Sequence, residues 1–104
     1  MKLISKGRAK LGNLGMVGVT QGTTTLDPPS LAGTISATAT PFTASGAALG
    51  DRVELYPPYD LQGITAQGYV SAPGTVTVVF SKSTAGTTDL ASGTWGYEVW
   101  RRAW

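Results

Sequence analysis

The side chains that could carry out chemistry are few, and two of the most useful kinds are missing. The 104 residues include six Asp or Glu but no histidine and no cysteine. Histidine is the commonest general base and transition-metal ligand, and a Ser-His-Asp triad requires it. Without cysteine the chain can form neither disulfides nor thiolate sites. The sequence therefore excludes triad and thiol catalysis, and we expect no cofactor.

The carboxylates are scattered and match no catalytic motif. A glycosidase needs two carboxylates flanking the scissile bond, and nothing around Glu54 and Asp60 marks such a pair. Asp51 follows Gly50 at a turn, where aspartate commonly caps backbone N–H groups. No Asp-rich calcium loop is present, although a single calcium ion at loop acids stays open. We predict that the protein is not an enzyme and has no catalytic or metal-ligating residues.

Basic residues gather at the two ends of the chain. Residues 1–26 hold Lys2, Lys6, Arg8 and Lys10 and no acid, whereas residues 27–100 carry a net negative charge. Basic side chains alone can neutralise phosphates, but no aromatic side chain lies among these four to stack on bases. We therefore disfavour nucleic acid and predict that the four residues bind an acidic surface on a partner protein.

Aromatic residues form two groups. Tyr56, Tyr59 and Tyr69 surround a Pro-Pro loop and could stack on sugar rings, which keeps a carbohydrate-binding module open as an alternative. The second group lies near the C-terminus. There, residues 95, 97 and 99 alternate as core residues of one strand should.

The C-terminal tip has the composition of an interface. Trp and Arg are enriched among the residues that anchor protein interfaces. We therefore predict an intersubunit or other partner contact through Trp100, Arg101, Arg102 and Trp104.

From Leu31 onward the chain alternates with a period of two, which is typical of half-buried strands. The pattern predicts strands over 34–40, 51–56, 64–70, 75–80 and 94–100, with 64–70 and 75–80 forming a hairpin across Pro73-Gly74. Pro41 predicts an edge position or a bulge. No segment shows a helical stripe. The predicted fold is all-β, an antiparallel β-sandwich or jelly-roll-like barrel with an extended N-terminal arm.

The first 26 residues combine repeated glycines, which disfavour a helix, with apolar side chains. We interpret residues 1–26 as an extended arm that becomes ordered on a partner; a first edge strand of its own domain is the alternative. Asp27-Pro28-Pro29 interrupts regular structure, so the β-sandwich domain is predicted at 27–104. The chain has no apolar run long enough to span a bilayer and no secretory signal, and we expect no membrane partner.

Six short stretches of turn and strand residues stand out, at 26–32, 47–51, 59–65, 69–72, 75–78 and 89–94. Together they resemble domains of small structural proteins of tailed bacteriophages, found in head decoration (cement) proteins and in head or tail fibres. The resemblance covers about residues 26–100 and carries no catalytic signature. It implies a β-sandwich that packs as a homo-oligomer, often a trimer, on the outer face of a virion shell.

The resemblance leads us to expect a virion protein that decorates the phage head and stabilises its shell by binding the major capsid protein. A tail, fibre or baseplate subunit is the alternative within the same class. The residues at 1–25 and 100–104 lie outside the resemblance, so it does not say how attachment occurs.

Overall fold

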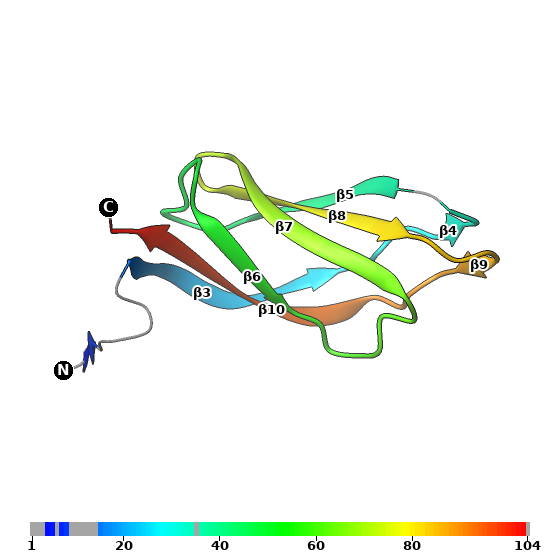
Figure 1. Ribbon diagram of the computed structural model, residues 1–104, viewed down its shortest axis with the longest axis horizontal. Helices are drawn as coiled ribbons and strands as arrows, with labels where there is room; N and C mark the ends of the chain where they lie inside the picture. The colour runs from blue at the N-terminus through cyan, green and yellow to red at the C-terminus, as the bar shows by residue number, and fades with distance from the viewer. Residues whose placement is uncertain (1–3, 6, 9–14, 35, 104) are drawn as a thin grey trace.

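The computed structural model describes residues 4–5, 7–8, 15–34 and 36–103. Within these ranges all regular secondary structure is β-strand (Figure 1). The strands are β1 Ile4–Ser5, β2 Gly7–Arg8, β3 Met16–Leu26, β4 Leu31–Ala32, β5 Ser36–Thr43, β6 Arg52–Tyr56, β7 Ile64–Ala72, β8 Thr75–Lys82, β9 Thr87–Thr88 and β10 Gly93–Arg102. β1 and β2 form a short parallel pair. The prediction of an all-β protein is confirmed.

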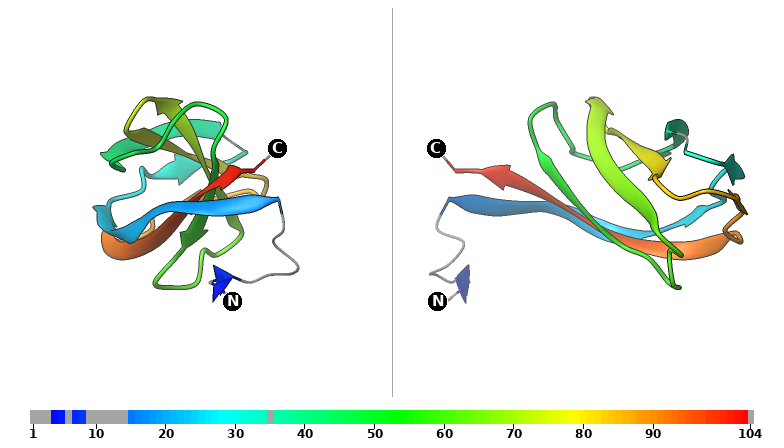
Figure 2. Two further views of the ribbon diagram at one scale, coloured as in Figure 1. Left: turned by 90° about the vertical axis from the view of Figure 1, so that its left-hand side faces the viewer. Right: turned by 45° about the vertical axis from the view of Figure 1, so that its right-hand side comes forward.

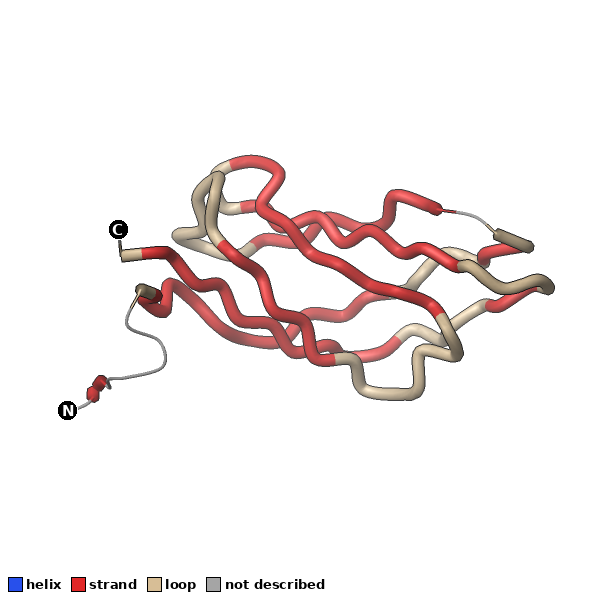
Figure 3. Tube along the Cα trace, viewed as in Figure 1, coloured by secondary structure: helices blue, strands red, loops and turns tan. Residues whose placement is uncertain are grey.

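Six strands form one antiparallel sheet in the order β3-β10-β6-β7-β8-β5. The sheet curls, so that β5 and β8 lie over β3 and β10 while β6 and β7 connect the two layers (Figure 1, Figure 2). β4 and β9 form a small antiparallel sheet among the loops at the end away from the termini (Figure 3). The architecture is that of a β-sandwich or a barrel-like fold.

The hairpin between β7 and β8 confirms the prediction made from its turn. Val70 lies opposite Val76 and Ile64 opposite Lys82. Gly74 has a φ of +77°, a conformation that residues with a Cβ rarely adopt and that the tight turn requires. The prediction for Pro41 is also confirmed, because β5 is an edge strand and its pairing with β8 shifts register between Thr38 and Pro41.

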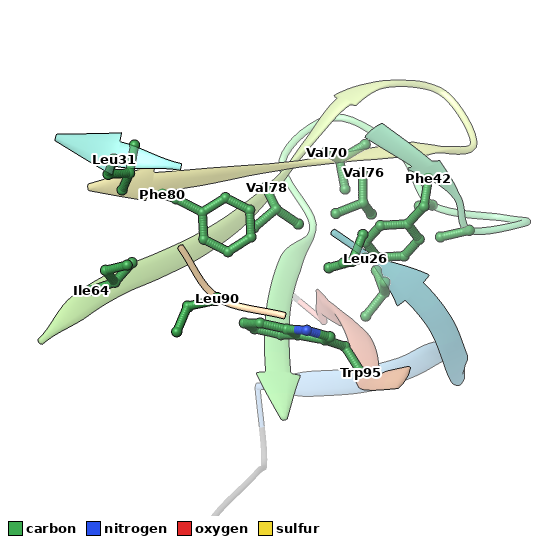
Figure 4. Packing of buried hydrophobic residues seen from close by; sticks show 13 residues of the cluster. Leu26, Leu31, Phe42, Ile64, Val70, Val76, Val78, Phe80, Leu90 and Trp95 are labelled. Carbon is green, nitrogen blue, oxygen red and sulfur yellow. The ribbon is translucent and has the colours of Figure 1, made fainter. Parts of the chain in front are cut away.

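The core fills the space between the two layers (Figure 4). Trp95 is fully buried, with its ring centroid 5.8 Å from Phe80 and 6.0 Å from Tyr59, both in edge-to-face geometry. Val99 is buried and Tyr97 is half-buried against Phe42, as the alternation in β10 predicted. Among the residues whose burial the structure describes, the buried apolar cluster is Leu26, Leu31, Phe42, Ala44, Ala47, Ile64, Val70, Val76, Val78, Phe80, Leu90, Trp95 and Val99.

Residues 16–26 differ from the prediction of an arm that ends before Asp27. They form β3, which pairs with β10 along its whole length, from Leu26 opposite Gly93 to Met16 opposite Arg102. Leu26 is 1% exposed and belongs to the core. The threonine-rich, uncharged segment suits a pleated surface and gains a hydrogen-bonded ladder from its own chain, with one shift of register between Val99 and Trp100. The edge-strand alternative therefore describes this segment, and the compact fold begins before residue 27.

Lys82 is a buried cation that closes the end of the fold away from the termini. Its side chain is on the core side of β8 and the residue is 4% exposed. Its Nζ donates to the carbonyl oxygens of Gly33, Thr84, Ala85 and Gly86 at 2.5–3.4 Å. These carbonyls replace the water that a buried ammonium group would lose. One side chain thereby joins the β8–β9 connection to the loop after β4.

Arg101 closes the opposite end. It lies on the same side of β10 as Trp95 and Val99 and reaches the β5–β6 loop, where it donates from Nε and Nη2 to Asp51 at 2.9 and 2.8 Å. Nη2 also donates to the Gly46 carbonyl, and Asp51 accepts from the Ala48 N–H. The bond from Arg101 holds the pKa of Asp51 below its ordinary value and raises the pKa of Arg101. Arg101, predicted as a partner-binding residue, therefore has a role within its own fold.

Replacing Trp95 with alanine should lower the free energy of unfolding by about 3–5 kcal/mol, because it leaves a large cavity beside Phe80. Trp95 Nε1 has no hydrogen-bond partner among the described residues. Trp95→Phe therefore loses no hydrogen bond, and it should lower the free energy of unfolding by less than half as much as Trp95→Ala does. Urea denaturation followed by far-UV circular dichroism measures both values. Equal losses in the two variants would contradict the role assigned to ring packing.

Replacing Asp51 with asparagine should remove a pH-dependent part of the stability. Because the pKa of Asp51 is lowered by folding, its contribution is complete above the ordinary aspartate pKa of about 4 and is lost as the pH falls through the lowered value. The wild type should melt about 2–5 °C higher than Asp51→Asn near neutral pH, a small margin because Arg101 is half exposed. The two melting curves should converge in acid. A difference that stays constant down to about pH 2 would argue against this ion pair.

Candidate functional site

The face of β6 and β10 that is turned away from the core presents basic, acidic and aromatic side chains next to one another. Arg52, Glu54 and Tyr56 alternate outward from β6, and Glu98 and Trp100 alternate outward from β10. Tyr56 is 50% exposed, and Trp100 is half-buried. The sheet ladder therefore fixes the spacing of these side chains.

Two aromatic side chains on this face each lie beside a glycine of the neighbouring strand. Tyr56 is opposite Gly96, where an added Cβ would lie 3.4 Å from the tyrosine Cβ and 3.6 Å from its ring. Trp100 is opposite Gly18, where an added Cβ would lie 3.8 Å from the indole ring. Because glycine has no side chain, each aromatic group can lie close to the backbone of the strand next to it.

Glu98 lies between these two aromatic residues and accepts a hydrogen bond from each. The Tyr56 hydroxyl donates to Oε1 at 2.8 Å, and Trp100 Nε1 donates to the same oxygen at 3.3 Å. The bond to Glu98 raises the pKa of Tyr56, with smaller contributions from desolvation and from the charges of Glu98 and Glu54. We call Tyr56, Glu98 and Trp100 the outer platform.

Charges surround the outer platform on the β6 side. Glu54 lies directly opposite Glu98, and Arg52 Nε is 3.9 Å from Glu54 Oε1. Like charges that face each other across two strands cost stability, and Arg52 offsets this only through an exposed, solvent-screened pair. The face therefore has a weak negative excess at its centre.

Shallow clefts adjoin one another around the outer platform. One of about 330 Å³ is lined by Met16, Arg52, Glu54, Tyr56, Glu98 and Trp100. A second of about 370 Å³ is lined by residues 21–23, Tyr56 and residues 96–98. The two share Tyr56 and Glu98, and we call them together the outer groove. Further clefts of about 270 and 500 Å³ adjoin it over residues 18–21 and between β6 and β7.

The outer groove offers groups suited to binding. It presents two aromatic side chains, a carboxylate that accepts two hydrogen bonds and an Arg–Glu pair. Within the described residues, no group of three potential metal ligands comes together. This arrangement can bind a ligand by ring contact and hydrogen bonding.

The predicted partner-binding residues fall into several places. Trp100 belongs to the outer platform, Arg101 pairs with Asp51, and Arg102 lies exposed opposite Met16. Arg8 lies in β2, where only the backbone is described. The remaining four, Lys2, Lys6, Lys10 and Trp104, lie outside the described residues.

One residue proposed from sequence as a sugar platform has a structural role instead. Tyr59 packs its ring edge against Trp95 and donates its hydroxyl to the Ala91 carbonyl. Glu98, in contrast, had no part in the sequence-based site. Its outward direction follows from the alternation that placed Trp95, Tyr97 and Val99 inward, but its position beside Tyr56 required the register between β6 and β10.

Strand pairing brings the two ends of the chain together. β3 begins where β10 ends, and the Ala103 N–H donates to the Gly15 carbonyl at 2.6 Å. Both termini consequently lie at one end of the elongated molecule (Figure 1). Arg101 and Arg102 end β10 here, and Asp51 is held at the same end by Arg101. Asp27, Asp60 and Asp89 lie in the β3–β4, β6–β7 and β9–β10 loops.

No helix among the described residues is long and apolar enough to cross a membrane. Comparison of the chain with protein-family models, with curated proteins and with solved structures found no significant match.

Proposed function

We propose that this protein is a structural, non-enzymatic attachment protein that decorates a virion shell, with the major capsid protein as its partner. The observation that carries the proposal is the basic N-terminal segment, which leads from the end of the fold where β10 finishes with Arg102 opposite Met16. Arg101 lies at the same end, where its charge is paired with that of Asp51. A molecule with a basic segment at one end docks on an acidic surface in one orientation.

Attachment through this end explains how a small domain stabilises a large shell. Each contact by the basic segment is weak and screened by salt, but copies bound on a regular lattice combine their contacts through high effective concentration. A protein that binds the assembled shell and not its separate subunits stabilises the shell by mass action. The rigid β fold then needs no active site, and its low content of charged residues suits a surface that packs beside other subunits.

The resemblance to phage virion domains supports a homo-oligomer, with a trimer favoured, and a location on the capsid surface. The alternative is a tail, fibre or baseplate subunit, which would have the same fold at a different position in the particle. Copy number per particle distinguishes the two, because a shell lattice binds hundreds of copies and a tail structure binds few. Quantitative cryo-electron microscopy of the particle measures this number.

Replacing Lys2, Lys6, Arg8 and Lys10 together with glutamine should weaken binding to purified empty shells of the phage that carries this chain by at least about tenfold at physiological salt, because the segment loses its four charges. Arg52→Gln is the control, since it removes an exposed arginine that lies in the sheet and outside the N-terminal segment. Sedimentation of shells with labelled protein gives both affinities. Saturation of the shells by the fourfold variant at wild-type concentrations would refute attachment through this segment.

The position of β3 sets where truncation can be made. Deleting residues 1–14 leaves β3 intact, so the truncated protein should fold and fail to bind shells. Deleting residues 1–26 removes the strand paired with β10 and a core leucine, so this protein should not fold. Circular dichroism separates the two outcomes, and a folded protein after the longer deletion would contradict the assignment of β3.

A further inference from the structure

We propose that the outer groove binds a neutral saccharide chain, with Tyr56 and Trp100 as stacking surfaces and Glu98 as the central hydrogen-bond acceptor. The groove runs over β6, β10 and β3, from Met16 and Trp100 near the end of the fold from which the N-terminal segment leads, to residues 21–23 and 96–98 farther along the sheet. The inference adds a ligand-binding activity to the proposed function and does not depend on it.

The first support is the arrangement of the aromatic residues. Tyr56 and Trp100 lie on adjacent strands of one rigid sheet, each beside a glycine that leaves room for the ring. Aromatic faces carry partial negative charge and attract the weakly positive C–H groups on one face of a pyranose ring. Both side chains also have a polar end, and both of those ends point to the same carboxylate. Their ring orientation is consequently held before any ligand binds.

The second support is the pair of hydrogen bonds that Glu98 accepts. Two donors converge on Oε1, which orients the carboxylate, and an ionised carboxylate has about four acceptor positions. Vicinal sugar hydroxyls are donors that suit such an acceptor. A preorganised acceptor binds at lower entropic cost than a free side chain. A role limited to stability does not explain why Glu98 lies directly opposite Glu54, since that placement costs stability.

Charge and shape select the class of ligand. The cleft between the two aromatic side chains holds Glu54 and Glu98 against one arginine, so it disfavours phosphate, sulfate and uronic acid groups. Two clefts of about 330 and 370 Å³ that share Tyr56 and Glu98 form a continuous surface across β6, β10 and β3. Each is at the lower limit of small-molecule sites, which is about 300 Å³, and together they fit a short chain better than a single ring.

A cationic peptide is the competing occupant, because it also pairs with carboxylates and aromatic rings. Protein interfaces of standard size contain a central set of large apolar anchors. The two rings that the outer groove presents are Tyr56 and the half-buried Trp100, and the polar end of each is hydrogen-bonded to Glu98, so the centre of the groove is a carboxylate and not an apolar anchor. The polar, ring-lined groove therefore fits a saccharide better.

The test is titration of the full chain with neutral hexaoses of glucose, mannose, galactose and N-acetylglucosamine, followed by isothermal calorimetry. A polyuronate hexamer and an oligolysine peptide serve as the competing probes. We expect at least one neutral hexaose to bind with a Kd between about 10 μM and 1 mM, and the polyuronate not to bind. Failure of all four neutral probes at millimolar concentration, or tighter binding of oligolysine, would overturn the proposal.

Variants locate the site. Tyr56→Ala should weaken hexaose binding at least about tenfold, and Glu98→Gln several-fold, because the first removes a stacking surface and the second removes the charge of the acceptor. Tyr56→Phe keeps the ring but removes one of the two donors that orient Glu98, so its loss of affinity should be intermediate. Leu49→Ala is the control, since Leu49 is an exposed apolar residue of the β5–β6 loop that lines none of the clefts described above. Equal losses in Tyr56→Ala and Leu49→Ala would place binding elsewhere.

The N-terminal variants separate this activity from attachment. The fourfold glutamine variant should lose shell binding and bind hexaose like the wild type. Tyr56→Ala should do the reverse. Loss of hexaose binding in the fourfold variant would show that the basic segment, and not the outer groove, holds the saccharide.

Discussion

The structure depends on the two-sided pairing of β10. This strand has β3 on one side and β6 on the other, and its residues alternate between the two faces of the sheet. The inward series places Trp95 and Val99 in the core and ends in Arg101, which fastens the β5–β6 loop through Asp51. The outward series places Glu98 and Trp100 beside Tyr56. Because its side chains alternate between the two faces, β10 contributes residues to both the core and the candidate site.

The sequence was sufficient where a local pattern fixes structure alone. The alternation of Thr75–Phe80, the Pro73-Gly74 turn and the position of Pro41 predicted the β7–β8 hairpin and an irregular edge strand. It was insufficient where structure depends on a distant partner. The glycines in β3 are unfavourable for a strand by themselves, but Gly18 and Gly22 lie beside Trp100 and Tyr97 of β10. Only the register between the two strands shows that these glycines leave space for rings.

The candidate site could likewise be predicted only in part from the sequence. Trp100 was identified from its residue type, but Glu98, Tyr56 and Gly96 become one surface only through pairing of strands some forty residues apart. Arg101 has the composition of an interface residue and a structural role, because its position on the inward face of β10 brings it to Asp51. Residue type indicates which groups can bind, and strand register decides which of them meet. In this fold the register decides which side chains share the outward face of β6 and β10.

Amide hydrogen exchange of the isolated, dilute protein measures the pairing of β3 with β10 most directly. If residues 16–26 are an edge strand of their own chain, the amides that face β10 should be protected to nearly the same degree as those of β10 itself. Amides on the free edge of β3 should exchange faster. Rapid exchange throughout residues 16–26, with β10 still protected by β6, would show that the segment is an arm awaiting a partner and would contradict this structure.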